Sequence, residues 1–170
     1  MSKKAGIRAV AAVTLSLILI MQIAGCSLIK NVTGGAKSAE KEYAEKVFEY
    51  LKNEDIESLC NLFSPKMKKT HDLEKEWEEF FAHMDGKIES YKSIKYQNEG
   101  MGKDKNGEIY KEHYGVNYNG ARTTSGTVYK EFGYYHDVVN RNDPESEGMM
   151  VFTLKDPDTG TWYTVGGETE

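Results

Sequence analysis

The segment 108–119, EIYKEHYGVNYN, decides the fold of this chain because it alternates strictly between two sets of residues. Side chains of a β-strand point alternately to the two faces of a sheet, so each set predicts one face. The sets are Glu108, Tyr110, Glu112, Tyr114, Val116 and Tyr118 on one side, and Ile109, Lys111, His113, Gly115 and Asn117 on the other. The tyrosines and the valine make the first set the better candidate for the core-facing side. Glu112 is then predicted to point inward among tyrosines.

Further strands are predicted on both sides of this segment, throughout the chain after Gly86. There Tyr, Val, Thr and Ile alternate with polar residues between glycine-containing turns. The predicted strands are 87–98, 108–119, 127–140, 148–155 and 161–166, and the predicted turns are 105–107, 119–120 and 156–160. A bulge at Gly133 would exchange the two faces of the strand 127–140, so both assignments of its inward side stay open.

Helical spacing replaces this alternation before Gly86. The predicted helices are 39–52, with Tyr43, Val47, Tyr50 and Leu51 on one side; 55–63, with Asp55 as its N-cap; and about 70–84, with Leu73, Trp77, Phe80, Phe81 and Met84 on one side. Ser64 and Pro65 are predicted to stop the second helix. Helices followed by an antiparallel sheet predict an α+β domain, with three N-terminal helices against one face of a curved sheet.

Composition divides the chain into a basic, apolar segment 1–25 and an acidic, aromatic remainder. The remaining 145 residues hold 19 basic and 27 acidic side chains, a formal charge of −8, and all of the aromatic residues. A remainder of this size predicts one domain. Its acidic balance excludes the basic patch that nucleic-acid binding needs, so no nucleic-acid partner is expected.

The N-terminal segment has the pattern of an export signal. Basic residues are followed by the apolar run 9–21 and then by Ile23, Ala24, Gly25 and Cys26. These four residues resemble the lipobox of bacterial lipoproteins, which implies cleavage after Gly25 and lipidation of Cys26. The expected organisation is a signal peptide at 1–25, a lipidated flexible spacer at 26–38 and a single domain at 39–170. The expected location is the extracytoplasmic face of the cell membrane, and the alternative is an uncleaved membrane anchor with an incidental cysteine.

Three further stretches resemble a family of uncharacterised lipoproteins from Gram-positive bacteria. They are LKNEDIESLCNLFSP at 51–65, HMDGKIESYKS at 83–93, and Thr161, Trp162 and Tyr163. The resemblance covers about residues 39–166. It implies the cone of nuclear transport factor 2-like and cystatin-like domains, in which helices and a bent sheet enclose either a filled core or a ligand pocket. It implies no catalytic signature.

Within such a cone, one carboxylate is a weak candidate for catalysis. Glu112 among tyrosines would have a raised pKa and a hydroxyl partner, which are the requirements of a proton-transferring isomerase or dehydratase. The alternative is a Glu112 that faces solvent beyond the sheet edge or lies on a dimer surface. The candidate ligand-pocket residues are Tyr110, Glu112, Tyr114, Tyr118 and Trp77.

No cofactor or metal is predicted from the remaining polar residues. His113 and His136 would form a metal site only if they met across paired strands, and two unlinked histidines are more typical of aromatic packing. Cys60 lies beside apolar residues and is predicted to be buried, not reactive.

Three functions follow from these observations. The favoured one is a noncatalytic module, anchored to the membrane by lipid, that binds a small ligand or an envelope protein in the cone or on an exposed sheet face. The many tyrosines favour it, because tyrosine offers a large contact area with a polar tip. The alternatives are an isomerase or dehydratase that depends on Glu112, and a structural domain that forms a homodimer.

Overall fold

The computed structural model describes residues 35–167, and a compact unit begins at Glu40. The predicted signal peptide, the predicted lipidation site Cys26 and most of the predicted spacer lie outside the described residues. No helix in the described part of the chain has the length and apolar character needed to cross a membrane.

Within residues 35–167, four helices precede the strands, and polar side chains cap three of them. They are α1 (Gly35–Asn53), α2 (Ile56–Asn61), α3 (Pro65–Thr70) and α4 (Leu73–Ala82). Asp55, Ser64 and Asp72 accept hydrogen bonds from backbone N–H groups in the first turns of α2, α3 and α4, respectively. Such bonds satisfy donors that have no partner inside a helix.

Three helices were predicted in this region, whereas the described residues form four. The helix α1 begins four residues earlier than predicted, within the predicted spacer. Pro65 was expected only to stop a helix. It also begins one, because it occupies the first turn of α3 and Ser64 caps that turn. Proline has no N–H group, but the first turn of a helix does not need one from it.

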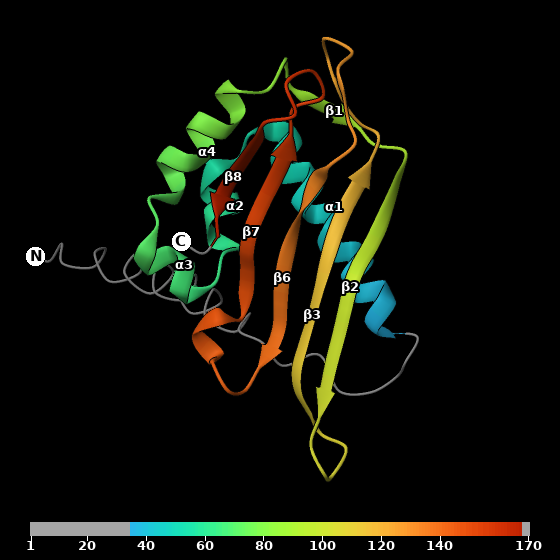
Figure 1. Ribbon diagram of the computed structural model, residues 1–170, viewed down its shortest axis with the longest axis vertical. Coiled ribbons are helices and arrows are strands. Elements are labelled where there is room, and N and C mark those ends of the chain that lie inside the picture. The colour runs from blue at the N-terminus through green and yellow to red at the C-terminus, as the bar shows by residue number, and fades with distance from the viewer. Residues whose placement is uncertain (1–34, 168–170) are drawn as a thin grey trace, which may run out of the picture. The chain divides into compact units, whose positions relative to one another are not determined.

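The strands form two antiparallel sheets (Figure 1). The five-stranded sheet has the order β2 (Ser93–Lys103), β3 (Ile109–Asn119), β6 (Phe132–Asn140), β7 (Gly148–Lys155) and β8 (Trp162–Gly166). The small sheet has the order β1 (Ile88–Ser90), β4 (Ala121–Thr123) and β5 (Val128–Tyr129). A short 3-10 helix, Pro144–Ser146, lies between β6 and β7.

Two predicted strands proved to be composite. The strand 87–98 divides into β1 and β2, and 127–140 divides into β5 and β6 with a break at Lys130 and Glu131. Each strand changes sheets at the break, and alternation alone does not record such a change. Gly133 pairs regularly with Asn117 and makes no bulge, whereas the β3–β6 register shifts beyond Asp137. The strand β4 was not predicted.

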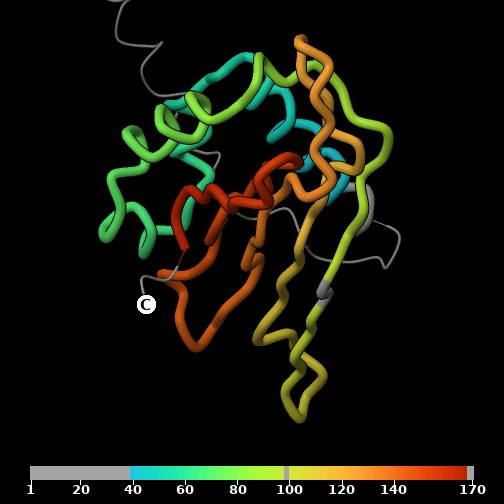
Figure 2. The backbone as a smooth tube through the Cα atoms, turned by 45° about the horizontal axis from the view of Figure 1, so that its top comes forward, coloured from blue at the N-terminus to red at the C-terminus, as the bar shows by residue number. Residues whose placement is uncertain are grey.

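The helices cover one face of the five-stranded sheet (Figures 1 and 2). Val116, Tyr134, Phe152 and Val165 lie side by side in the register of β3, β6, β7 and β8, and all four side chains are buried. The sequence therefore indicated the inward face of β3 correctly near its C-terminal end. The α+β class, with helices first and antiparallel sheet after them, is confirmed.

Candidate functional site

Aromatic rings fill the space between the helices and the sheet. Trp77 of α4 is fully buried, and its ring packs against Phe80, Phe81 and Phe152. Tyr118 of β3 is also fully buried, and its hydroxyl donates a 2.7 Å hydrogen bond to the carbonyl oxygen of Ala44. Two of the five predicted ligand-pocket residues, Trp77 and Tyr118, are thus components of the core.

The other three lie farther along β3, where the sheet is less covered. Tyr110 is exposed, and Glu112 and Tyr114 are half-buried. Partial burial raises the pKa of Glu112, as the sequence predicted for an inward carboxylate. The structure brings Tyr114 near His136, with parallel rings 6.5 Å apart, whereas Glu112 lies opposite Val139 of β6.

His136 faces the helices and is enclosed by aromatic rings. Its ring lies 4.7 Å from that of Tyr43 in α1, and burial lowers its pKa to about 4. His113 pairs with Asp137 on the opposite face of the sheet, so the two histidines cannot share a metal ion. Among the described residues, no cluster of three or more histidine, cysteine or carboxylate side chains is placed to hold a metal.

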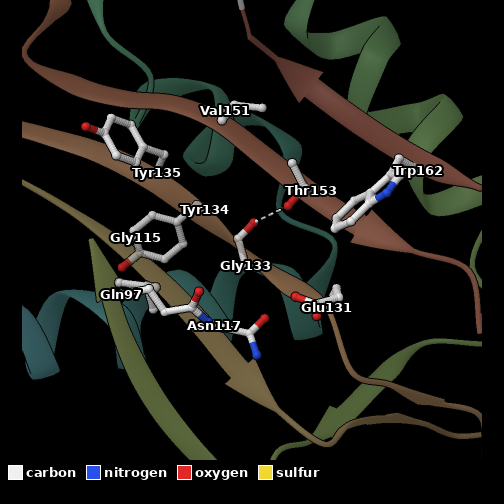
Figure 3. Close-up of a pocket in the computed structure, with 11 residues that line it drawn as sticks. Gln97, Gly115, Asn117, Glu131, Gly133, Tyr134, Tyr135, Val151, Thr153 and Trp162 are labelled. Atoms are coloured by element: carbon white, nitrogen blue, oxygen red, sulfur yellow. Dashed lines mark hydrogen bonds between the residues drawn. The ribbon is translucent and has the colours of Figure 1, made fainter. Parts of the chain in front are cut away.

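A hollow of about 170 Å³ lies on the sheet face opposite the helices (Figure 3). Its floor crosses β3, β6 and β7, and its edges reach β2 and the first residue of β8. The lining residues are Gln97, Gly115, Val116, Asn117, Glu131, Gly133, Tyr134, Tyr135, Val151, Thr153 and Trp162. None of the five predicted pocket residues belongs to this set.

Two glycines form the floor of the hollow, because no side chain rises from the sheet at their positions. Gly115 and Gly133 are direct neighbours of Val116 and Tyr134, whose side chains fill the opposite face. A Cβ atom on Gly133 would lie 1.9 Å from the carbonyl oxygen of Val116, and one on Gly115 would lie 3.0 Å from that of Gln97. The close approach of the strands therefore requires glycine at 133, and its missing side chain leaves the outer face concave.

Polar groups surround this floor. Glu131 is exposed, and it forms no ion pair with a basic side chain in the described part of the chain. Thr153 makes one long hydrogen bond of 3.5 Å to the carbonyl oxygen of Gly133, so its hydroxyl is weakly held. Asn117 has a structural role, because its amide bonds the backbone of Lys130 and Phe132 and so fixes the start of β6.

Trp162 supplies an aromatic wall at one edge of the hollow. Its side chain is 51% exposed, whereas that of Trp77 is completely buried. The ammonium group of Lys155 lies 5.3 Å from the centre of the Trp162 ring, a cation–π contact. Tyr135 lines the hollow from β6, and burial raises the pKa of its hydroxyl. The hollow thus combines two aromatic side chains with a carboxylate, an amide and a hydroxyl.

The loops at 104–108 and 156–160, which include two of the predicted turns, are closed by aspartate side chains. Asp104 accepts hydrogen bonds from the N–H groups of Asn106 and Glu108, and Asp156 accepts them from those of Asp158 and Thr159. Cys60 is a free, half-buried cysteine, and burial raises the pKa of its thiol. A raised thiol pKa disfavours the reactive thiolate, although Cys60 is less buried than predicted.

These features define an α+β domain with helices on one sheet face and a shallow polar and aromatic hollow on the other. Residues 46–156 match the model of a family described as a domain of unknown function, DUF5104. The match covers more than half of the chain, which therefore belongs to that family. No curated protein matches the sequence.

The residues of the hollow were not predicted as a site from the sequence. Gly115 was assigned correctly to the outer face of its strand, but one small residue gives no indication of a hollow. The pairing of Gly115 with Tyr135, and of Gly133 with Asn117 and Thr153, brings the glycines together, and this register is a property of the assembled sheet. Trp162 follows the predicted turn 156–160, and its exposure at the edge of the hollow is seen only in the folded chain.

Proposed function

We propose that this protein is a noncatalytic binding module that holds a small polar ligand in the hollow on the outer face of its five-stranded sheet. The observation that carries the proposal is the exposed Trp162 beside the glycine floor and the polar groups of Glu131, Gln97 and Thr153. Aromatic and convergent polar groups around a concave surface are typical of ligand sites.

We place this module on the extracytoplasmic side of a membrane, held by lipid on Cys26. The lipobox resemblance supports the anchor, and each buried methylene of an acyl chain contributes about 0.8 kcal/mol to membrane binding. The helices on one face of an antiparallel sheet are also compatible with the nuclear transport factor 2-like cone, which we propose as the finer description of the fold. An envelope protein that presents a polar segment to the hollow is an alternative partner.

Chemical-shift mapping on the full-length protein tests the proposed site. A library of small polar compounds, neutral, cationic and anionic, is expected to contain some that shift the backbone amide resonances of Gly115, Gly133 and Thr153. Thr153→Arg fills the hollow and should abolish these shifts. Thr70→Arg makes the same change at the exposed end of α3 and should preserve them. Shifts confined to other surfaces, or unaffected by Thr153→Arg, would refute the site.

The isomerase or dehydratase hypothesis and the homodimer hypothesis stay predictions. Glu112 has the raised pKa that the first requires, but it does not line the hollow on the outer face. A homodimer would bury one sheet face, and sedimentation at increasing concentration tests it directly.

A further inference from the structure

The size and composition of the hollow narrow the chemistry of its ligand. The hollow has a volume of about 170 Å³. This volume is well below the pockets of about 300 Å³ or more that enclose a drug-sized ligand. The hollow therefore accommodates one ring of a ligand, and because it is open to solvent the rest of a longer chain can extend beyond it.

The aromatic wall requires a ligand with a flat apolar side. Trp162 exposes half of its surface at the edge of the hollow, and Tyr135 lines the hollow from β6 (Figure 3). An indole ring presents a large apolar surface together with a polar N–H group. Ligands that stack on such a ring and also satisfy neighbouring hydrogen-bonding groups are amphipathic rings.

Charge disfavours two classes of such rings. The carboxylate of Glu131, which forms no ion pair with another described residue, disfavours anionic ligands such as sugar phosphates on its side of the hollow, whereas the Lys155 ammonium group lies at the Trp162 edge. A cationic ligand would compete with Lys155, whose ammonium group already lies over the ring of Trp162. A neutral ring is repelled by neither charge, and it stacks on Trp162 either on the face that Lys155 leaves free or by displacing the ammonium group.

From these features we infer that the hollow binds a single neutral sugar ring of a glycan, with the C–H face of the ring on Trp162 and its hydroxyl groups bonded to Glu131, Gln97 and Thr153. This inference rests on the proposed function and adds the ligand class to it. A carboxylate, an amide and a hydroxyl together donate and accept hydrogen bonds, as ring hydroxyls do.

Tryptophan fluorescence of the full-length protein gives a direct test, since acrylamide reaches the exposed Trp162 and not the buried Trp77. The probes are neutral tetrasaccharides of glucose, of mannose and of N-acetylglucosamine, with choline as the cation and glucose 6-phosphate as the anion. At least one tetrasaccharide should protect Trp162 from quenching, with a Kd of about 1 mM or tighter. Choline and glucose 6-phosphate should not.

Calorimetry on variants then locates the binding. Trp162→Ala should weaken it more than about tenfold, whereas Tyr110→Ala, which removes another exposed aromatic side chain, should leave it unchanged. Glu131→Gln should admit glucose 6-phosphate. Binding of choline but of no tetrasaccharide would overturn the sugar assignment and leave the proposed site intact. If no tetrasaccharide binds but other compounds still shift the amide resonance of Gly133, the sugar assignment is wrong and the proposed site remains. If no tetrasaccharide binds and no compound shifts that resonance, the proposed function is wrong as well.

Discussion

At the scale of single residues, two tyrosines of the same strand show how differently one residue type is used. Tyr118 and Tyr110 were both predicted to line a pocket, and both belong to the same face of the alternation in β3. The first is fully buried and bonds the backbone of α1, whereas the second is exposed. Whether a tyrosine of β3 lies in the core or at the surface therefore depends on its position along the strand, because the helices cover only part of the strand's length.

Tyr118→Phe should therefore destabilise the protein by about 1–2 kcal/mol, because the ring stays in the core while the hydroxyl's hydrogen bonds to the Ala44 carbonyl and to Tyr134 are lost. Urea unfolding measures the difference. Tyr110→Phe removes a hydroxyl of the same kind from an exposed side chain and should change the free energy of unfolding by less than about 0.5 kcal/mol. Equal effects of the two changes would contradict the assignment of Tyr118 to the core.

His136 makes the stability of the protein depend on pH. Burial lowers its folded-state pKa from 6.5 to about 4, and the nearby Asp137 carboxylate only partly opposes this. A lowered histidine pKa means that the unfolded chain binds more protons, so stability falls as the pH decreases from about 6.5 to 4. The loss attributable to this residue is about 2–3 kcal/mol.

His136→Phe should flatten this part of the stability profile, measured by urea unfolding between pH 7 and about pH 4.5. His83→Phe is the matched control, because His83 is exposed and stacks on Tyr163 at the surface. The assignment fails if the control flattens the profile as much as His136→Phe does.

At the scale of elements, the contact between β3 and β6 depends on a missing side chain. Gly133→Ala should cost about 3 kcal/mol or more, since the new methyl group would overlap the carbonyl oxygen of Val116 and the strands would have to separate. Gly115→Ala meets only a tight contact of 3.0 Å and should cost about 1 kcal/mol. Thermal unfolding of both variants compares the two losses of stability. A Gly133→Ala variant more stable than Gly115→Ala would refute the strand geometry.

At the scale of the whole molecule, the predicted anchor and the folded domain are separable. Cys26→Ser should release the protein from membranes or leave the precursor unprocessed, because the lipid would have no attachment point. Cell fractionation with labelled fatty acid measures this. Cys60→Ser, a change at the half-buried cysteine of the domain, should leave membrane association intact. A processed Cys26→Ser protein that stays in the membrane fraction would contradict lipidation.

The sequence by itself determined the class of the fold and most of its elements. Alternation in 108–119 and 148–155 predicted β3 to within one residue and β7 to the residue, because side-chain period is a local property of a strand. Helical spacing likewise predicted α1 and α4 within a few residues. Predictions from local pattern failed where a strand changed sheets and where proline began a helix; they also missed β4, the first four residues of α1 and the end of β2 beyond residue 98.

Only the tertiary structure decided which face of the five-stranded sheet carries the candidate site. Sequence reasoning concentrated on the tyrosine face of β3, but aromatic rings from α1, α4, β6 and β7 meet there and fill the space. The hollow lies on the other face, where Gly115, Gly133, Thr153 and Trp162 come from four strands. Their proximity follows from strand order and register, which arise from contacts between distant parts of the chain, and no local period records them.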